Sequence, residues 1–127
     1  MIRTMLITLA AFAAISAANA QQSGIERQQL LQQDGPGDFQ TLVVMLQFVP
    51  GAREARHTHP GAVAGYVLDG TLTLEHEGRP TTKYNAGQAF YVEPGKVHLA
   101  INETNAPLKF LATLVVEKGK PPSSPAP

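Results

Sequence analysis

Residues 57–74 read HTHPGAVAGYVLDGTLTL and contain a pattern that is typical of two adjacent β-strands. A run of β-forming residues, Tyr66-Val67-Leu68, leads into Asp69-Gly70, a dipeptide that is typical of a tight turn. From Thr71 to Leu74 polar and apolar residues alternate, which is the period of a strand with one buried face. This stretch therefore predicts a strand, a turn and a second strand.

The same signals recur on both sides of this stretch. Upstream, Leu42 to Val49 is an apolar, β-rich run that ends at Pro50-Gly51. Downstream, short apolar runs are separated by turn signals that contain Gly78, Gly87 and Gly95. About seven or eight short strands with no helix-period segments between them predict an all-β sandwich or barrel and argue against a parallel α/β sheet.

The first twenty residues have the features of a secretory signal peptide. Arg3 supplies a positive start, Met5 to Ala17 is almost entirely apolar, and Ala18-Asn19-Ala20 has the small-x-small pattern of a cleavage site. The apolar run is shorter than the roughly 20 residues that a membrane-spanning helix needs. We therefore expect cleavage after Ala20, a periplasmic or secreted protein, and no membrane span in the mature chain.

The remaining chain is expected to form one domain, residues 21–118, followed by a proline-rich, disordered tail, residues 119–127. At the start of the domain, Ser23 to Gln33 is compatible either with a short helix opened by a capping box or with an edge strand. Hydrophobic residues make up 43% of the chain, and the formal net charge is zero. Such a composition supports a packed core and predicts no nucleic-acid partner. Cysteine is absent, so any metal ion must be bound by nitrogen and oxygen.

His57 and His59 are two positions apart, at the spacing that places both side chains on one face of a strand. Their Cα atoms would then be about 6.5–7 Å apart. Because an imidazole nitrogen binds a metal ion at roughly 2.0–2.1 Å, two such rings can share one ion. Taken alone, however, a His-x-His pattern is explained as often by a solvated strand face.

Two longer motifs resemble those of the cupin family. The first is Gly51-x5-His57-x-His59, which is followed by Gly70, and the second is Gly87-x5-Glu93-Pro94-Gly95-x2-His98-x3-Asn102. The resemblance implies a small jelly-roll or Greek-key β-barrel with a metal ion near its middle. It also implies that the ligands are His57, His59 and His98, and that the motif glycines lie at turns.

The first motif departs from the family pattern in one respect. Cupins usually carry a glutamate ligand shortly after the second histidine, but Pro60 to Ala64 contains no acid. The resemblance then implies a centre of three neutral histidines with open positions for water or substrate. Fe(II) is favoured, Zn(II), Mn(II) and Ni(II) suit the same nitrogens, and a decayed site with weak or no metal binding is the alternative.

Four further residues bear on the composition of the site. Glu93 can supply the missing carboxylate or a hydrogen bond to a histidine, although a solvent-facing position at the strand end is the plainer interpretation. Tyr66 and Tyr91 fit barrel strands and can place hydroxyl groups in the cavity, or can simply pack. His76 lies between two acids before a turn, which favours an exposed side chain that is not a ligand.

The function expected from these features is that of an exported metal-binding cupin acting on a small organic molecule. An Fe(II)-dependent dioxygenase is the leading reaction class, while a non-catalytic ligand- or metal-binding module and an isomerase are the alternatives. The sequence leaves open whether the protein is an enzyme. Edge-strand pairing through residues 27–33 would produce a homodimer.

Overall fold

The computed structural model describes residues 22–127, so the predicted signal peptide lies outside the described residues. Within this range all regular structure is β-strand, and no helix is long and apolar enough to cross a membrane. The ten strands are, in chain order, β1 (Ile25–Asp34), β2 (Phe39–Phe48), β3 (His57–Thr58), β4 (Val63–Asp69), β5 (Thr71–His76), β6 (Thr82–Asn85), β7 (Ala89–Val92), β8 (His98–Ile101), β9 (Leu108–Glu117) and β10 (Ser124–Pro125).

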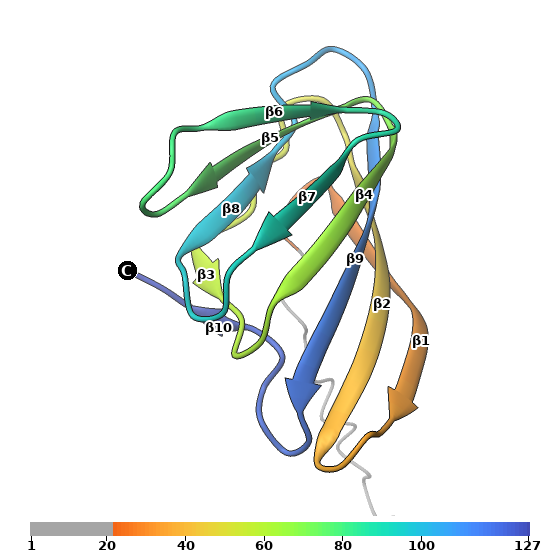
Figure 1. Cartoon of the computed structure of the whole chain (residues 1–127). Helices are drawn as coiled ribbons and strands as arrows, with labels where there is room; N and C mark the ends of the chain where they lie inside the picture. Colours follow the sequence, from red (N-terminus) through yellow and green to blue (C-terminus); the bar gives the residue numbers. More distant parts are fainter. Residues whose placement is uncertain (1–21) are drawn as a thin grey trace, which may run out of the picture.

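The strands form two antiparallel sheets that face each other (Figure 1). Sheet A has the order β1-β2-β9-β4-β7, and sheet B has the order β10-β3-β8-β5-β6. Strands far apart in the sequence are neighbours in both sheets, as β2 and β9 are in one and β3 and β8 in the other. The all-β jelly-roll barrel predicted from the sequence is therefore confirmed.

The core lies between the sheets and is built from the side chains that point inward from the strands of both sheets. Phenylalanines occupy its centre: the ring centroids of Phe48 and Phe110 are 5.5 Å apart, and those of Phe90 and Phe110 are 5.7 Å apart. Gly65 on β4 is paired with Phe90 on β7, and a Cβ atom at Gly65 would lie only 2.0 Å from the Phe90 ring. Glycine is therefore needed at this position because the aromatic ring occupies the space of a side chain.

The ambiguous segment near the start of the domain is an edge strand, not a helix. β1 pairs with β2 along one side only and forms one end of sheet A. Ile25 is buried, whereas every other side chain of β1 is exposed. Pairing with β2 decides the structure here, because the glutamine-rich sequence has no strong local preference.

The turn glycines of the two motifs behave as the resemblance implies. All four have positive φ angles: Gly51 (80°), Gly70 (80°), Gly87 (87°) and Gly95 (73°). Gly70 is the most restricted of them, since an added Cβ would lie 2.4 Å from the carbonyl oxygen of Pro107. A side chain there would meet both an unfavourable backbone conformation and the neighbouring loop.

Residues 119–127 differ from the expectation of a disordered tail. Ser124 and Pro125 form β10, which pairs with Thr58 and His57 of β3. Prolines are compatible with this position because β10 is an edge strand, where a missing N–H group breaks no ladder on the solvent side. Composition alone indicated disorder, but β3 offers backbone partners that the composition does not reveal.

Candidate metal centre

Three histidines lie in one row across the middle strands of sheet B. His57 on β3 is paired with His98 on β8, and His98 is paired with His76 on β5. Side chains of directly paired residues share a sheet face, and His59 follows His57 by two positions. The fold therefore brings all four histidines of the chain to one region.

His57, His59 and His98 form a compact cluster. One ring nitrogen from each lies within 4.8 Å of the other two. The ring centroids are 4.3 Å apart for His57 and His98, and 4.9 Å apart for the other two pairs. The three residues predicted as ligands are thus brought together in a group that can hold a metal ion.

Each ring of the cluster is oriented by a backbone carbonyl group. Nδ1 of His57 lies 2.7 Å from the oxygen of Ala55, and Nδ1 of His98 lies 3.0 Å from that of Lys96. Nδ1 of His59 lies 2.7 Å from the oxygen of Pro122. Because a carbonyl oxygen only accepts hydrogen bonds, each Nδ1 carries the hydrogen, and each Nε2 keeps a free lone pair.

Burial favours the neutral, metal-binding form of His59 and His98. Only 5% of His98 is exposed, and desolvation lowers the pKa of its ring to about 4, with a smaller contribution from the neighbouring histidines. Desolvation also lowers the pKa of His59. At neutral pH these two imidazoles therefore do not have to lose protons before they bind a cation.

A buried carboxylate lies beside the cluster, and sequence analysis missed it. Glu54 is 7% exposed, and its Oε2 lies 3.8 Å from Nε2 of His57. The same oxygen accepts a hydrogen bond from the Ala100 N–H (3.0 Å), and Oε1 pairs with Arg27 of β1 (3.1 Å). Glu54 precedes the first histidine, whereas the family pattern led us to look for an acid after the second. Its only local signal is its alternation with the buried Ala52.

Glu93 does not take the place of the missing motif glutamate. Its Oε2 lies 2.6 Å from Nε2 of His76, in a contact that lacks the alignment of a hydrogen bond, and 3.4 Å from Arg79. Its own backbone N–H, followed by Arg79 and His76, lowers the pKa of the Glu93 carboxyl group. The carboxylate thus faces a histidine of the row, but one outside the cluster.

His76 is buried, with 8% of its surface exposed, so the expectation of an exposed side chain was wrong. The sequence suggested exposure because two acids flank it, but the strand period directs His76 inward with Leu72 and Leu74. Its Nδ1 donates to the carbonyl oxygen of Glu77 (2.8 Å), and Glu93 faces Nε2. Nδ1 is therefore engaged away from the cluster, and Nε2 faces a carboxylate outside it.

The two candidate tyrosines do not reach the cluster. Tyr66 and Tyr91 are 46% and 47% exposed, at positions that alternate with buried residues of β4 and β7. They lie on the outer face of sheet A, so the suggestion that they line the cavity was wrong. Asn102, the last residue of the second motif, has a structural role: its fully buried side chain donates to the carbonyl groups of Phe48, Val49 and Ala106.

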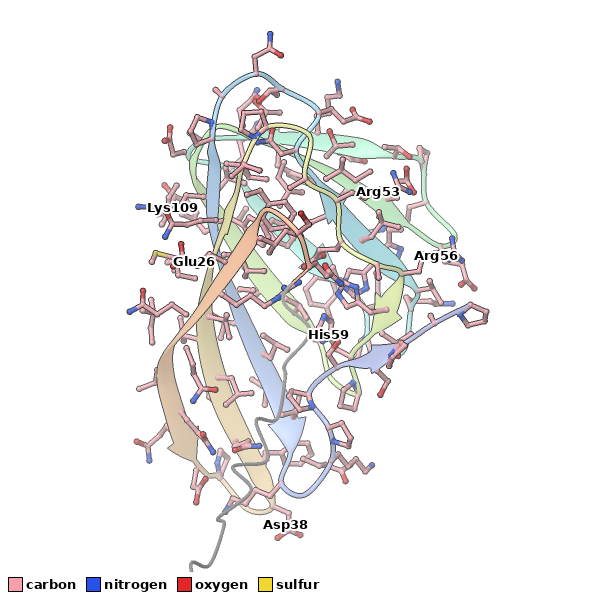
Figure 2. The ribbon with its side chains drawn as sticks, turned by 180° about the vertical axis from the view of Figure 1, so that it is seen from behind. Glu26, Asp38, Arg53, Arg56, His59 and Lys109 are labelled. Carbon is pink, nitrogen blue, oxygen red and sulfur yellow. The ribbon has the colours of Figure 1, made fainter. Side chains whose placement is uncertain are left out.

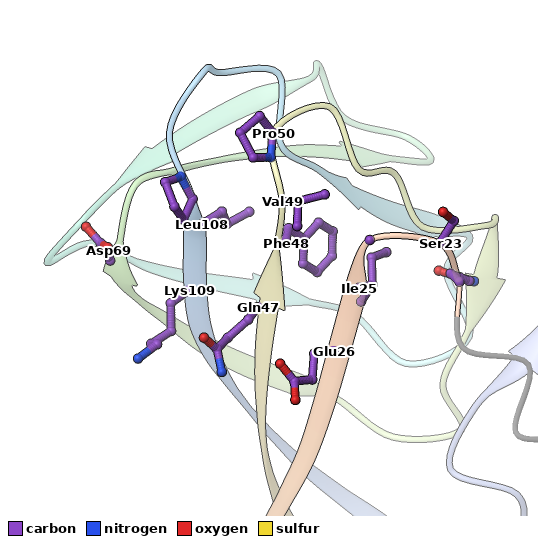
Figure 3. A pocket seen from close by; sticks show the side chains of 13 residues that line it. Ser23, Ile25, Glu26, Gln47, Phe48, Val49, Pro50, Asp69, Leu108 and Lys109 are labelled. Atoms are coloured by element: carbon purple, nitrogen blue, oxygen red, sulfur yellow. The ribbon is translucent and has the colours of Figure 1, made fainter.

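A pocket of about 660 Å³ lies at the start of β1 and contains none of the histidines. Figure 3 shows Phe48 and Leu108 in it, with the charged side chains of Glu26, Asp69 and Lys109 around them. A smaller pocket of about 230 Å³ includes His76 and His98 in its lining. The smaller pocket is the hollow that adjoins the candidate metal centre.

Residues 44–116 match the family model of the cupin domain, which is more than half of the chain. The chain belongs to the cupin family. The match includes both motifs and all three histidines of the cluster. No curated protein matches this cupin.

Solved structures show the same fold. A double-stranded β-helix protein from Klebsiella pneumoniae is 24% identical with a TM-score of 0.67, covering 83% of this cupin and 86% of that chain. A cupin-like protein from Thermotoga maritima is also 24% identical with a TM-score of 0.67, and the alignment covers 80% of this cupin and 75% of that chain. The polyketide cyclase RemF from Streptomyces resistomycificus is 22% identical with a TM-score of 0.65, and the alignment covers 84% of this cupin and 73% of that chain. At these identities the likeness concerns the fold alone.

Proposed function

We propose that this cupin binds one divalent metal ion through His57, His59 and His98 and acts on a small organic molecule beside it. The observation that carries this proposal is the hydrogen bond that all three rings share. Each Nδ1 donates to a backbone carbonyl group, which leaves each Nε2 free as a ligand. Such backbone partners fix the tautomer and direction of metal-binding histidines.

The distances within the cluster are compatible with one ion. Two nitrogens bound to the same ion at roughly 2.0–2.1 Å can be at most about 4.2 Å apart. The ligand nitrogens lie within 4.8 Å of one another, so small ring movements are sufficient. The nearby Glu54 carboxylate adds a negative charge that favours a cation at this position.

The proposed ion is Fe(II), and the proposed reaction is oxidation of the small molecule by dioxygen. An Fe(II) ion with three protein ligands would supply redox chemistry and open positions, whereas Zn(II) at the same nitrogens would supply Lewis-acid chemistry. The protein's part is to hold three neutral imidazoles and to shield them with the barrel. The low exposure of His98 and Glu54 supports this shielding.

Elemental analysis of protein purified without chelators tests the metal centre. We expect about one ion per chain, in line with a single three-nitrogen site. The variant His57→Ala/His59→Ala should lose the ion, whereas His76→Gln is the matched control, because His76 is a buried histidine outside the cluster. An unchanged metal content in the double variant would refute the proposal.

Oxygen uptake after anaerobic loading with Fe(II) tests the reaction. The substrates to screen are small diketones, phenols and thiols, each compared with the His98→Ala variant. Uptake that disappears in the variant supports a dioxygenase. Tight ligand binding without turnover would instead indicate a binding module, and activity that requires Zn(II) would exclude the oxidation.

We also propose export and self-association. Mass spectrometry of protein from the producing cell should give a mature chain that begins at Gln21.

Self-association is supported by the unpaired side of β1, where Leu30 and Leu31 are 48% and 45% exposed. Light scattering should give a dimer that Leu31→Glu dissociates, and a monomeric wild-type protein would contradict this part.

A further inference from the structure

The segment 121–127, which we term the C-terminal strap, runs along the outer side of β3. Beyond the β10–β3 pairing, the Ala126 N–H donates to the carbonyl oxygen of Arg56 (3.0 Å), and Nε of Arg56 donates to that of Pro127 (2.8 Å). The strap is therefore fastened on the residue that precedes His57. Figure 1 shows β10 beside β3 at the edge of sheet B.

The strap also contacts the metal cluster. Nδ1 of His59 donates to the carbonyl oxygen of Pro122 at 2.7 Å. The strap approaches the labelled His59 in Figure 2, where the structure is seen from behind. This contact joins two residues that are 63 positions apart in the sequence.

The other two cluster histidines are oriented differently. His57 and His98 each donate to the carbonyl group of the residue two positions before them, in the same chain segment. Their ring directions are therefore set locally. His59 alone depends on a distant segment, so the orientation of the third ring is decided only when the strap is in place.

We propose that the C-terminal strap is an integral part of the metal centre, in which the Pro122 carbonyl group is the positioning group for His59. The effect on metal binding rests on the proposed function, whereas the effect on the His59 ring does not. Without the strap, Nδ1 would face water, and either ring nitrogen could carry the hydrogen. The lone pair of Nε2 would then no longer be fixed toward the cluster.

The composition of the strap suits this role. Four of its seven residues are prolines, whose fixed φ angles reduce the conformational entropy that is lost when the segment becomes ordered. Proline also leaves its carbonyl oxygen available as an acceptor. A short segment with few donors can therefore stay in place with the contacts described above.

NMR spectra of the imidazole nitrogens in the metal-free protein test the positioning directly. In the full chain, all three cluster histidines should carry the hydrogen on Nδ1. In a chain that ends at Lys120, His59 alone should become a mixture of tautomers, with His57 and His98 as internal controls. An unchanged tautomer of His59 in the shortened chain would overturn the proposal.

Metal affinity provides the second measurement, with Co(II) as the probe. Loss of a partner that orients a ligand typically weakens metal binding about 10- to 100-fold, and we expect a loss of this size in the shortened chain. Equal affinities for the two chains would refute the strap's role and leave the three-histidine centre intact. Absence of Co(II) binding by the full chain would refute the proposed function, while the tautomer measurement would still decide the positioning.

Point variants keep the proposal testable if the shortened chain does not fold. Ala126→Pro removes the hydrogen bond to Arg56, and Arg56→Ala removes the bond to Pro127. The double variant should shift the His59 tautomer in the same direction as truncation. Ser123→Ala is the matched control, because the exposed Ser123 side chain makes no hydrogen bond in the structure described for residues 22–127. An effect of the control as large as that of the double variant would contradict the proposal.

Discussion

Sheets A and B face the same core but present different side chains to it. Sheet A contains three strands of ten residues, and its buried inward side chains are apolar. Sheet B has shorter strands, and its inner face passes from Leu72 and Leu74 to the row of histidines. Apolar burial that stabilises the fold is therefore concentrated in sheet A, whereas the groups capable of metal chemistry are concentrated in sheet B.

Because of this division, the site can contain polar groups while most of the buried apolar surface is kept in sheet A. Each buried polar group needs a partner, and the segments next to the strands of sheet B supply a backbone carbonyl group for every cluster histidine. Glu54 is likewise satisfied by Arg27 and the Ala100 N–H. Substitutions in the two sheets should therefore affect different properties.

The largest effect is expected from a cavity in sheet A. Leu108 is fully buried, and Leu108→Ala should lower the free energy of unfolding by about 2–5 kcal/mol. Leu68→Ala, at a position that is 42% exposed, is the control and should cost less than about 1 kcal/mol. Urea denaturation of the metal-free proteins measures both. Similar losses in the two variants would argue against sheet A as the main source of stability.

Removal of a cluster histidine should weaken metal binding and leave the β-structure intact. We expect His98→Ala to weaken Co(II) binding by at least about 100-fold, since one of three ligands is lost. Isothermal titration calorimetry measures the affinity, and circular dichroism checks that the variant keeps its β-structure. A variant that binds Co(II) like the wild type would show that the row of histidines is only structural.

A smaller effect is expected from the carboxylate beside the cluster. Glu54→Gln keeps the shape of the side chain but removes its charge, and should weaken Co(II) binding about tenfold. Glu75→Gln is the control, because Glu75 pairs with Arg53 on the exposed side of sheet B. If the two variants weaken binding equally, the effect would come from net charge and not from the position of Glu54.

The smallest effect concerns the pH dependence of the metal-free protein. Burial lowers the pKa of His98 from 6.5 to about 4, so between these values the unfolded chain binds more protons than the folded chain. The contribution to stability is therefore complete above about pH 6.5 and is lost as the pH falls to about 4. Denaturation curves across this range should show a weaker pH dependence for His98→Ala than for the wild type.

Much of this architecture could be predicted from local patterns. The strand from Thr71 to Leu74, the turn glycines and the spacing of His57 and His59 each depend on neighbouring residues, and the structure agrees with them. The predicted alternation is incomplete, however, because Thr73 is buried as well as Leu72 and Leu74. The inward direction of His76 also follows from strand period, but the flanking acids suggested otherwise. In this strand the alternation decides the direction of the side chain, and the neighbouring charges do not.

Other features depend on contacts between distant segments. The sequence contains Glu54, but its place beside His57 depends on the approach of β8, which supplies the Ala100 N–H. Glu93 faces His76 because the end of β7 lies beside β5 in space, and no spacing in the sequence indicates this pair. Likewise, the outward direction of Tyr66 and Tyr91 depends on which face of sheet A packs on the core.

By itself, the sequence determined that the chain forms β-strands and where most of them turn, while its resemblance to the cupin motifs implied which three imidazoles would meet. The strands and turns follow from side-chain alternation and glycine conformation, both of which act over a few residues. Only the tertiary structure decided that the final residues become β10, that Pro122 orients His59, and that Glu54 is the carboxylate beside the cluster. Those outcomes depend on hydrogen bonds between segments whose meeting is set by the closure of the whole barrel.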